Sequence, residues 1–325
     1  MKAIKFFAIS AMAAAMITSC SSEDELSQSN YPSDNIIRVT AGVNNAKTRA
    51  DGTGTEMKND FSLTIVNKNA PKYTYTDKVF SKKSGDWACS ETLLWQKSDA
   101  LVDIVAFAPA QTGKFNGVYA EGSIKPITYS VASDQSTSSD KNDLLYYYAK
   151  DFNPGESLDK GKLNIKFNHA FCMIDINVTL GTEFNKPSIQ TTSPIIKVTL
   201  GGTKIAANVN VTNAASVVTA SETAAATDIT TTNGSFTTAA NAETNAKSCF
   251  SCIAIPQTVA ANTFKVSLMT AGKRYEWTSD KEITLQSGYR YTLNLSMGND
   301  VVLLKGGGIT ATKWTEISGG SLETE

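Results

Sequence analysis

Apolar and polar residues alternate with a period of two along much of this chain. Leu163, Ile165 and Phe167 alternate with polar neighbours, and the apolar residues of 172–180 and 289–297 follow the same pattern. This alternation is typical of half-buried antiparallel strands that keep one face in water. We predict further strands at 35–43, 61–67, 72–80, 92–96, 101–107, 127–131, 143–148, 194–201, 204–211, 250–255, 264–270, 282–285 and 309–317.

No long amphipathic helix is predicted, and Gly, Asn, Asp and Ser separate the strands, so the pattern favours an all-β protein built from β-sandwiches. The polar segment 181–193 predicts a boundary between two domains, 50–181 and 182–325. Residues 211–247 differ in composition, since 20 of these 37 residues are Ala or Thr. Such a segment has little apolar surface to bury, and we expect a long loop inserted in the second domain.

The first fifty residues carry a targeting pattern. Lys2 and Lys5 precede an apolar run, 6–17, that is too short to span a bilayer, and small residues then lead to Cys20. This pattern predicts a lipoprotein signal peptide over 1–19 and attachment of an acyl chain (palmitate) at Cys20. The acidic run 21–25 resembles the surface-export signal of Bacteroidetes lipoproteins.

A second processing site follows in a polar, Gly-rich stretch. Arg49 and Ala50 form a basic cleavage site, which would make 20–49 a removable propeptide. The propeptide contains a predicted strand whose apolar residues share one face: Ile37, Val39, Ala41 and Val43. Before cleavage this strand would complete the first sandwich. Its removal would expose an apolar groove with unpaired backbone groups, which is a template for another chain's strand.

The composition narrows the possible chemistry. A net charge of −1 and a pI near 6.0 argue against a nucleic-acid partner. One histidine leaves little scope for histidine-based catalysis or zinc binding, and we expect no metal and no cofactor. Besides Cys20 there are four cysteines, which allow three disulfide pairings. A chain of this size, however, can fold around a hydrophobic core without disulfides. Cys249 and Cys252 lie on a predicted strand with opposite orientations, so we interpret them as small apolar strand residues.

Other residues have both a structural and a functional interpretation. His169, between two predicted strands, is expected to be structural because no nucleophile motif accompanies it. The three tyrosines 146–148 and four tryptophans could form a glycan-stacking surface, but aromatic residues also fill sandwich cores. Carboxylates cannot be paired from sequence, so nothing predicts an enzyme.

Several motifs occur in the order found in one protein family. They are Cys20 with its preceding residues, Thr48-Arg49-Ala50, Leu94-Trp95-Gln96, 105–109, 143–146, 167–171, 255–258, 288–293 and 309–314. On these motifs the chain resembles the fimbrillin family of Bacteroidetes, which builds donor-strand-assembled (type V) pili. The resemblance implies two transthyretin-like antiparallel β-sandwich domains in tandem, and cleavage after Arg49 by an arginine-specific surface protease. The Ala/Thr-rich segment departs from the family pattern.

The resemblance also implies polymerisation with other fimbrial subunits. The donor strand should be a free extended segment, and the tail 306–325 qualifies, with Ile309, Ala311, Trp314 and Ile317 as candidate donor residues. Lys313 and Thr315 interrupt the apolar face of this segment. The predicted location is the outer membrane, held by lipid on Cys20 before cleavage, and then the fimbrium at the cell surface.

Two further functions compete with that of a structural pilin. A tip adhesin, or an anchor or surface lipoprotein, would bind a host glycan or protein. A tip subunit needs an acceptor groove but no donor tail, and an anchor would keep its lipid and stay uncut at Arg49. A glycan hydrolase is a more distant alternative, because it would require paired buried carboxylates in a cleft.

Overall fold

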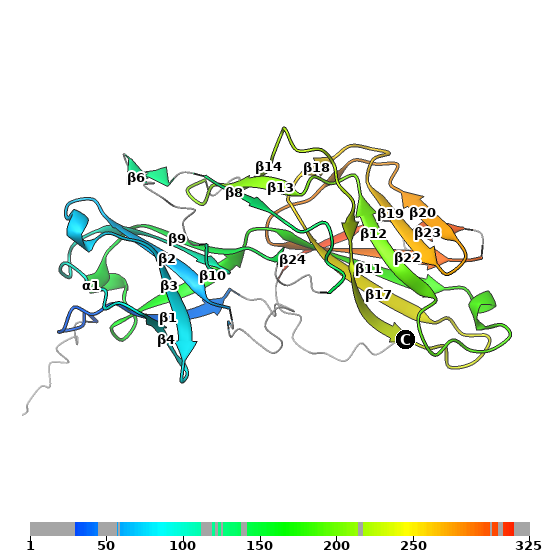
Figure 1. Cartoon of the computed structure of the whole chain (residues 1–325), viewed down its shortest axis with the longest axis horizontal. Helices are drawn as coiled ribbons and strands as arrows, with labels where there is room; N and C mark the ends of the chain where they lie inside the picture. The colour runs from blue at the N-terminus through cyan, green and yellow to red at the C-terminus, as the bar shows by residue number, and fades with distance from the viewer. Residues whose placement is uncertain are drawn as a thin grey trace, which may run out of the picture.

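The computed structural model describes residues 30–44, 57, 59–111, 119–120, 123–124, 126–137, 142–213, 217–299, 301–304 and 308–314. Two all-β bodies lie end to end along the long axis of the molecule (Figure 1). The described part holds one α-helical turn, α1 (Pro154–Ser157), beside short 3-10 turns, so the prediction of an all-β protein is confirmed. Several strands also have the predicted bounds, including β2 (Phe61–Asn67), β11 (Cys172–Leu180) and β22 (Tyr289–Met297).

The first body is a closed barrel of seven strands. In order around the barrel they are β1 (Arg38–Val43), β10 (Lys162–His169), β9 (Leu145–Phe152), β5 (Val102–Ala108), β2, β3 (Tyr75–Lys83) and β4 (Asp86–Cys89). Every residue of β2 and β5 is buried, so these two strands form the centre of the core. Phe61 makes aromatic contacts with Phe80, Trp87 and Phe167 in the barrel interior.

The second body contains two principal sheets. The larger sheet runs β16 (Thr232–Thr237), β17 (Lys247–Ala254), β11, β22 and β23 (Val302–Leu304), and β24 (Thr310–Lys313) also pairs with β22. The smaller sheet runs β15 (Ile229–Thr230), β12 (Ile195–Gly201), β19 (Lys265–Thr270) and β20 (Arg274–Thr278). Two-residue strands β18 (Thr258–Val259) and β21 (Ile283–Thr284) form a minor ladder in this body, and a separate ladder of β6 (Tyr119–Ala120) and β7 (Ser123–Ile124) precedes β8 in the chain.

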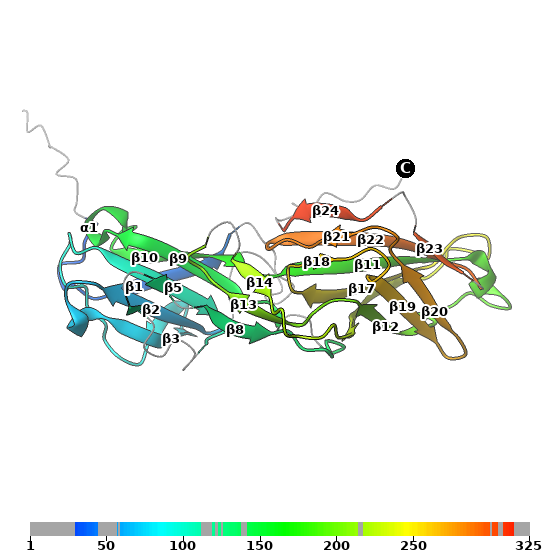
Figure 2. The same ribbon diagram turned by 90° about the horizontal axis from the view of Figure 1, so that it is seen from above.

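A third sheet joins the two halves of the sequence. β8 (Ile127–Ser130) pairs with β13 (Ala206–Val209), and β13 pairs with β14 (Val218–Ala220). Figure 2 shows this sheet near the middle of the long axis. The buried amide of Gln135, just beyond β8, bonds both the N–H and the carbonyl of Ile253 on β17. Residues 127–135 therefore dock on the second body although they precede the last strands of the first.

The chain passes between the two bodies earlier than the predicted boundary at 181/182. β11, assigned from sequence to the first domain, pairs with β17 and β22 over its length and belongs to the second body. The crossover is at Ala170 and Phe171, whose side chains are fully buried. The polar segment 181–193 is a connection within the second body. A buried crossover carries no polar linker composition, which is why sequence reasoning missed it.

The Ala/Thr-rich segment 211–247 was expected to be a loop that buries little, and this expectation is wrong for its described residues. β14, β15 and β16 lie within it and pair with three different sheets. Ile229, Ala239 and Ala246 are at most 4% exposed. Threonine favours extended backbone, and alanine fits where neighbouring layers approach closely, so tertiary contacts overrode the weak apolar pattern.

Two strand pairs are parallel, whereas the periodicity predicted antiparallel strands with one wet face. β1 runs parallel to β10, and β11 runs parallel to β22. β11 lies inside its sheet and is buried at seven of its nine positions, including Met173 and Asp175 on the face expected to be wet. Strand direction depends on which segments pair, and that information lies outside the local pattern.

The cysteines do not form disulfides: Cys89, Cys172, Cys249 and Cys252 are all free. Cys172 is paired with Ala254, and Cys252 with Ile174, so the two buried thiols are diagonal rather than directly opposite on β11 and β17. The Cys172 thiol donates to the Ala254 carbonyl at 3.2 Å. Burial raises the pKa of both thiols, which keeps them protonated and unreactive.

We therefore predict two classes of thiol. In the native protein iodoacetamide should modify the half-exposed Cys89 and Cys249, while Cys172 and Cys252 should react only after denaturation. Mass spectrometry of peptides labelled before and after unfolding measures this. Equal labelling of all four thiols in the native state, or a disulfide between Cys172 and Cys252, would contradict the prediction.

Candidate functional site

The predicted removable strand is the first strand of the barrel. Ile37, Val39 and Val43 point inward with exposed fractions of 6%, 5% and 6%, and Ala41 is half-buried. Arg38 and Thr40 are exposed between them. Three of the four predicted residues are therefore buried, and the alternation with exposed neighbours is clear from Ile37 to Thr40. Burying each of the larger side chains contributes about 1.5–3 kcal/mol, so β1 is firmly seated.

The two edges of β1 are held unequally. On one side β1 pairs with β10 from Arg38 through Val43, and Asn44 donates to the Phe167 carbonyl at 2.7 Å just beyond. On the other side only Val39 pairs, with Trp87 of β4. The barrel is therefore closed at a single residue pair. Withdrawing β1 would break the ladder to one neighbour and leave the edge of β10 unpaired.

The second body contains a counterpart to β1. Each body has a first strand that runs parallel to its last long strand, β1 beside β10 and β11 beside β22. β11 pairs over eight residues on each side, with β22 and with β17, whereas β1 has a full ladder on one side only. The first strand of the second body, β11, is therefore hydrogen-bonded along both edges. The first strand of the first body, β1, is hydrogen-bonded along one edge and at a single residue on the other.

The motif Leu94-Trp95-Gln96 fixes the start of β1. The predicted strand at 92–96 is instead a single bridge between Leu94 and Ile36. Trp95 donates its backbone N–H to Asn35 at 2.8 Å, and Ile37 donates to the Leu93 carbonyl at 2.9 Å. The Trp95 side chain is buried and stacks on Phe152. The segment therefore holds the residues at the start of β1 by backbone hydrogen bonds and is not itself a strand.

An exposed ion pair joins the first residue of β1 to the turn before it. The Arg38 guanidinium donates to Asp34 at 2.9 Å and lowers the pKa of this carboxyl to about 2. Both groups are exposed, and a pair of this kind contributes little to stability. The seating of β1 therefore rests on its apolar face and its ladder with β10.

The predicted donor tail is docked on its own second body. β24 pairs antiparallel with β22, from Thr310 opposite Thr292 to Lys313 opposite Tyr289. All four residues of β24, including Ala311, are exposed, and Ile309 is half-buried. A cavity of about 420 Å³ beside the tail is lined by Trp277, Ile283, Tyr291 and Ile309 among others. Backbone pairing thus supplies most of the contact along β24 itself.

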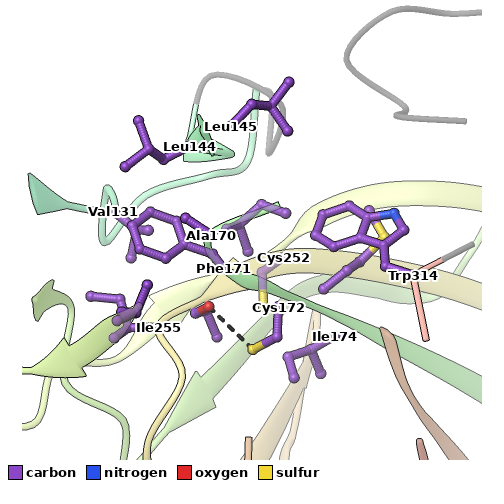
Figure 3. Close-up of a cluster of buried hydrophobic side chains, with 14 of the residues drawn as sticks. Val131, Leu144, Leu145, Ala170, Phe171, Cys172, Ile174, Cys252, Ile255 and Trp314 are labelled. Atoms are coloured by element: carbon purple, nitrogen blue, oxygen red, sulfur yellow. Dashed lines mark hydrogen bonds between the residues drawn. The ribbon is translucent and has the colours of Figure 1, made fainter. Parts of the chain in front are cut away.

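Trp314 is the exception, since it is the buried anchor of the tail. Its side chain is 6% exposed and stacks on the imidazole of His169, with ring centroids 3.7 Å apart. Its backbone N–H donates to the Gly288 carbonyl at 2.7 Å. Figure 3 shows the indole beside the buried side chains that surround the start of β11. The tail is therefore pinned at the junction of the two bodies.

His169 is held in turn by a buried carboxylate. Its Nδ1 lies 2.8 Å from Asp143 Oδ2, and both side chains are nearly inaccessible. Within the described chain Nε2 of His169 and Oδ1 of Asp143 have no hydrogen-bond partner. The structural role expected for His169 is consistent with this position. Sequence reasoning had singled out the motif 143–146 but gave Asp143 no partner, because 26 residues separate it from His169.

Four of the predicted site residues, Cys20, Arg49, Ala50 and Ile317, lie outside the described residues. The described part of the chain has no cluster of His, Cys, Asp or Glu suited to a metal ion. Among its helices none is long and apolar enough to cross a membrane.

The fold and these two terminal segments define a class: an elongated two-body β-protein. Its first described strand closes a barrel through a single residue pair, and its last described strand lies at a sheet edge. A sequence profile described as fimbrillin-like matches residues 48–314. The chain belongs to the fimbrillin-like family. Membership supports a role as a fimbrial subunit at the cell surface.

Solved structures show the same fold at low sequence identity. A candidate cell adhesion protein from Bacteroides ovatus has a TM-score of 0.60 at 16% identity, with 86% of this chain and 97% of that chain covered. One from Bacteroides uniformis has a TM-score of 0.57 at 15% identity, covering 87% and 100%. A fimbrial protein from Bacteroides vulgatus has a TM-score of 0.54 at 17% identity, covering 86% and 99%. A comparison with curated proteins found no match.

Proposed function

We propose that this protein is a structural subunit of a cell-surface fimbria and that it polymerises by donor-strand exchange. It is exported as a lipoprotein acylated at Cys20, which holds it at the outer membrane. An arginine-specific surface protease cuts after Arg49 and releases β1. The C-terminal tail of a neighbouring subunit then fills the vacated position beside β10, and the polymer serves adhesion. The two bodies are related as tandem transthyretin-like domains.

The main support for this proposal is the difference between the two edges of β1: it has a full ladder with β10 and a single pair with β4. A permanently held strand would have ladders on both sides, as β11 has in its sheet, but β1 pairs with β4 at Val39 alone. Its inner face nevertheless buries Ile37, Val39 and Val43. Such a strand can be replaced by any extended segment that offers three apolar side chains in alternation. Arg49 follows β1 by only six residues, so a cut there frees the strand from the rest of the chain.

The tail offers the second half of the exchange. β24 is an exposed edge strand with one buried side chain beyond it, so its removal leaves the remaining sheets intact. Ile309 and Ala311 occupy alternating positions, as the inner residues of β1 do. Val301 and Leu303, just before the tail, are 49% and 58% exposed, which suits a segment that gains a partner on assembly.

Deletion of 306–325 tests the proposal. The shortened chain should fold, shown by an unchanged β-type circular dichroism spectrum, yet fail to form ladders on gels run without boiling. A chain shortened only by 318–325 is the matched control, because it keeps all four candidate donor residues, Ile309, Ala311, Trp314 and Ile317. Normal ladders from the chain lacking 306–325 would rule out the tail as the donor.

A further inference from the structure

A cleft of about 530 Å³ lies where the two bodies meet, away from β1 and outside the function proposed above. Tyr146, at the start of β9, lines one side, and Val218 of β14 lies beside it. The second body supplies the other wall through the segments 256–258 and 284–289. Figure 2 shows β9, β14 and β18 approaching one another near the middle of the molecule. The cavity volume is within the range of about 300–1,000 Å³ that is usual for small-molecule sites.

Two tyrosines face this cleft, one from each body. Tyr146 and Tyr289 both line the cavity and are both half-buried, so part of each residue remains accessible there. Burial raises the pKa of Tyr146, so its hydroxyl remains a donor at neutral pH. In the described part of the chain neither hydroxyl has a hydrogen-bond partner, and the same is true of the exposed Gln286 amide.

The remaining polar groups of the cleft are neutral as well. They are the hydroxyls of Thr258, Thr284 and Ser287 and the amide of Gln257, and no charged residue lines the cavity. Two other cavities of the described chain differ, since one is lined by Lys197, Asp228 and Arg274. The other includes Asp280, Lys281 and Glu282. Lack of charge argues against phosphate, nucleotide or carboxylate ligands here and favours a neutral polar one.

The walls of the cleft are fixed before any ligand arrives. The Gln257 amide donates to the Lys204 carbonyl at 2.9 Å and accepts from the Lys204 N–H at 2.9 Å. Ser287 Oγ donates to the Ala170 carbonyl at 2.6 Å, which ties this wall to the buried crossover. The Tyr291 hydroxyl accepts from the Gln286 N–H at 2.8 Å. A preorganised wall reduces the entropy that a ligand must lose on binding.

We propose that this cleft binds a neutral saccharide of one or two pyranose rings. The apolar face of a pyranose stacks on an aromatic ring, and its hydroxyls both donate and accept hydrogen bonds, as do the Tyr146, Tyr289 and Gln286 side chains. The site would make each subunit a carbohydrate-binding unit, whether or not it stands at the tip of a fimbria. It also gives Tyr146, the first of the three consecutive tyrosines, a role beyond core packing.

The test uses the intact monomer and a panel of neutral disaccharides: lactose, maltose, cellobiose, mannobiose and N,N′-diacetylchitobiose. Saturation-transfer NMR and calorimetry at millimolar sugar should detect binding of at least one of them. Tyr146→Ala and Gln286→Ala should each weaken that binding by roughly three- to tenfold. Tyr148→Ala, which alters a tyrosine outside the cleft, is the matched control and should change it by less than about twofold.

Gln286 is exposed, so its variant keeps the test valid even if Tyr146→Ala fails to fold. Tyr146→Phe should retain stacking and lose only the hydroxyl contact. The proposal is overturned if no sugar of the panel binds, or if binding survives both cleft variants unchanged. Because the assay uses monomers, its outcome is independent of whether the chain polymerises.

Discussion

Cleavage after Arg49 is expected to convert the monomer into a polymer that forms ladders on gels run without full boiling. While the chain is intact, β1 is tethered beside its groove and returns there whenever it leaves, because the tether keeps its effective concentration high. Once the chain is cut, the fragment 20–49 can dissociate and be diluted. The inner positions of Ile37, Val39 and Val43, each contributing about 1.5–3 kcal/mol, then become available to a neighbour's strand.

Two substitutions test whether assembly depends on cleavage at Arg49. Arg49→Ala should leave a monomer that still begins at Cys20 after treatment with an arginine-specific protease. Arg49→Lys should behave likewise with that protease, because an arginine-specific enzyme does not cut after lysine. N-terminal sequencing of the assembled wild type should start at Ala50. Ladders from Arg49→Ala that match the wild type would show that cleavage does not trigger assembly.

A synthetic peptide of residues 35–44 provides a direct probe of the vacated groove. Added in excess during cleavage, it should occupy the position of β1 and suppress the ladders. The same peptide with Val39→Asp is the matched control, because it would place a carboxylate at a buried position next to Trp87. Equal inhibition by both peptides would argue that strand replacement at β1 is not involved.

Trp314→Ala is expected to release the tail from its own body, which is the second large effect. Every residue of β24 is exposed, so pairing with β22 is the main contact that remains once the indole is removed. Truncating a buried tryptophan costs about 3–5 kcal/mol. An exposed edge strand of four residues cannot offset that loss. Hydrogen exchange of 310–313 should therefore become fast, while the amides of β11 and β17 keep their protection.

Trp314→Phe is the matched control, because a phenyl ring can still stack on His169. It should retain most of the protection of 310–313. If the tail is the donor, the released tail of Trp314→Ala should also shorten the lag before ladders appear after cleavage. Unchanged exchange in Trp314→Ala would mean that backbone pairing alone holds β24, and Trp314 would then have no anchoring role.

The success and failure of the strand predictions have separate causes. β2, β11 and β22 were predicted residue for residue because their flanking turns and alternation are both strong. β4 and β20 were missed, since Asp86–Cys89 and Arg274–Thr278 are short segments without a clear apolar alternation. Their strand character comes from pairing with β3 and β19, which lie earlier in the chain.

The candidate site shows the same division. The inward set Ile37, Val39, Ala41 and Val43 follows from alternation alone, and so does the extended character of the tail. The unequal borders of β1 do not, since they depend on β10 and β4, which lie far from β1 in sequence. The contact of Trp314 with His169, 145 positions apart by their residue numbers, is equally invisible to local patterning.

The amino-acid sequence by itself determined the all-β class, the inner face of β1, the position of the tail and the motifs that mark the family. These are properties of single segments, set by side-chain polarity and backbone preference. Only the tertiary structure decided that β11 belongs to the second body and that the Ala/Thr-rich segment contributes strands to three sheets. The stacking of Trp314 on His169 was likewise visible only in the tertiary structure. Each of these depends on which distant segments share a core, because burial is a property of the assembled molecule.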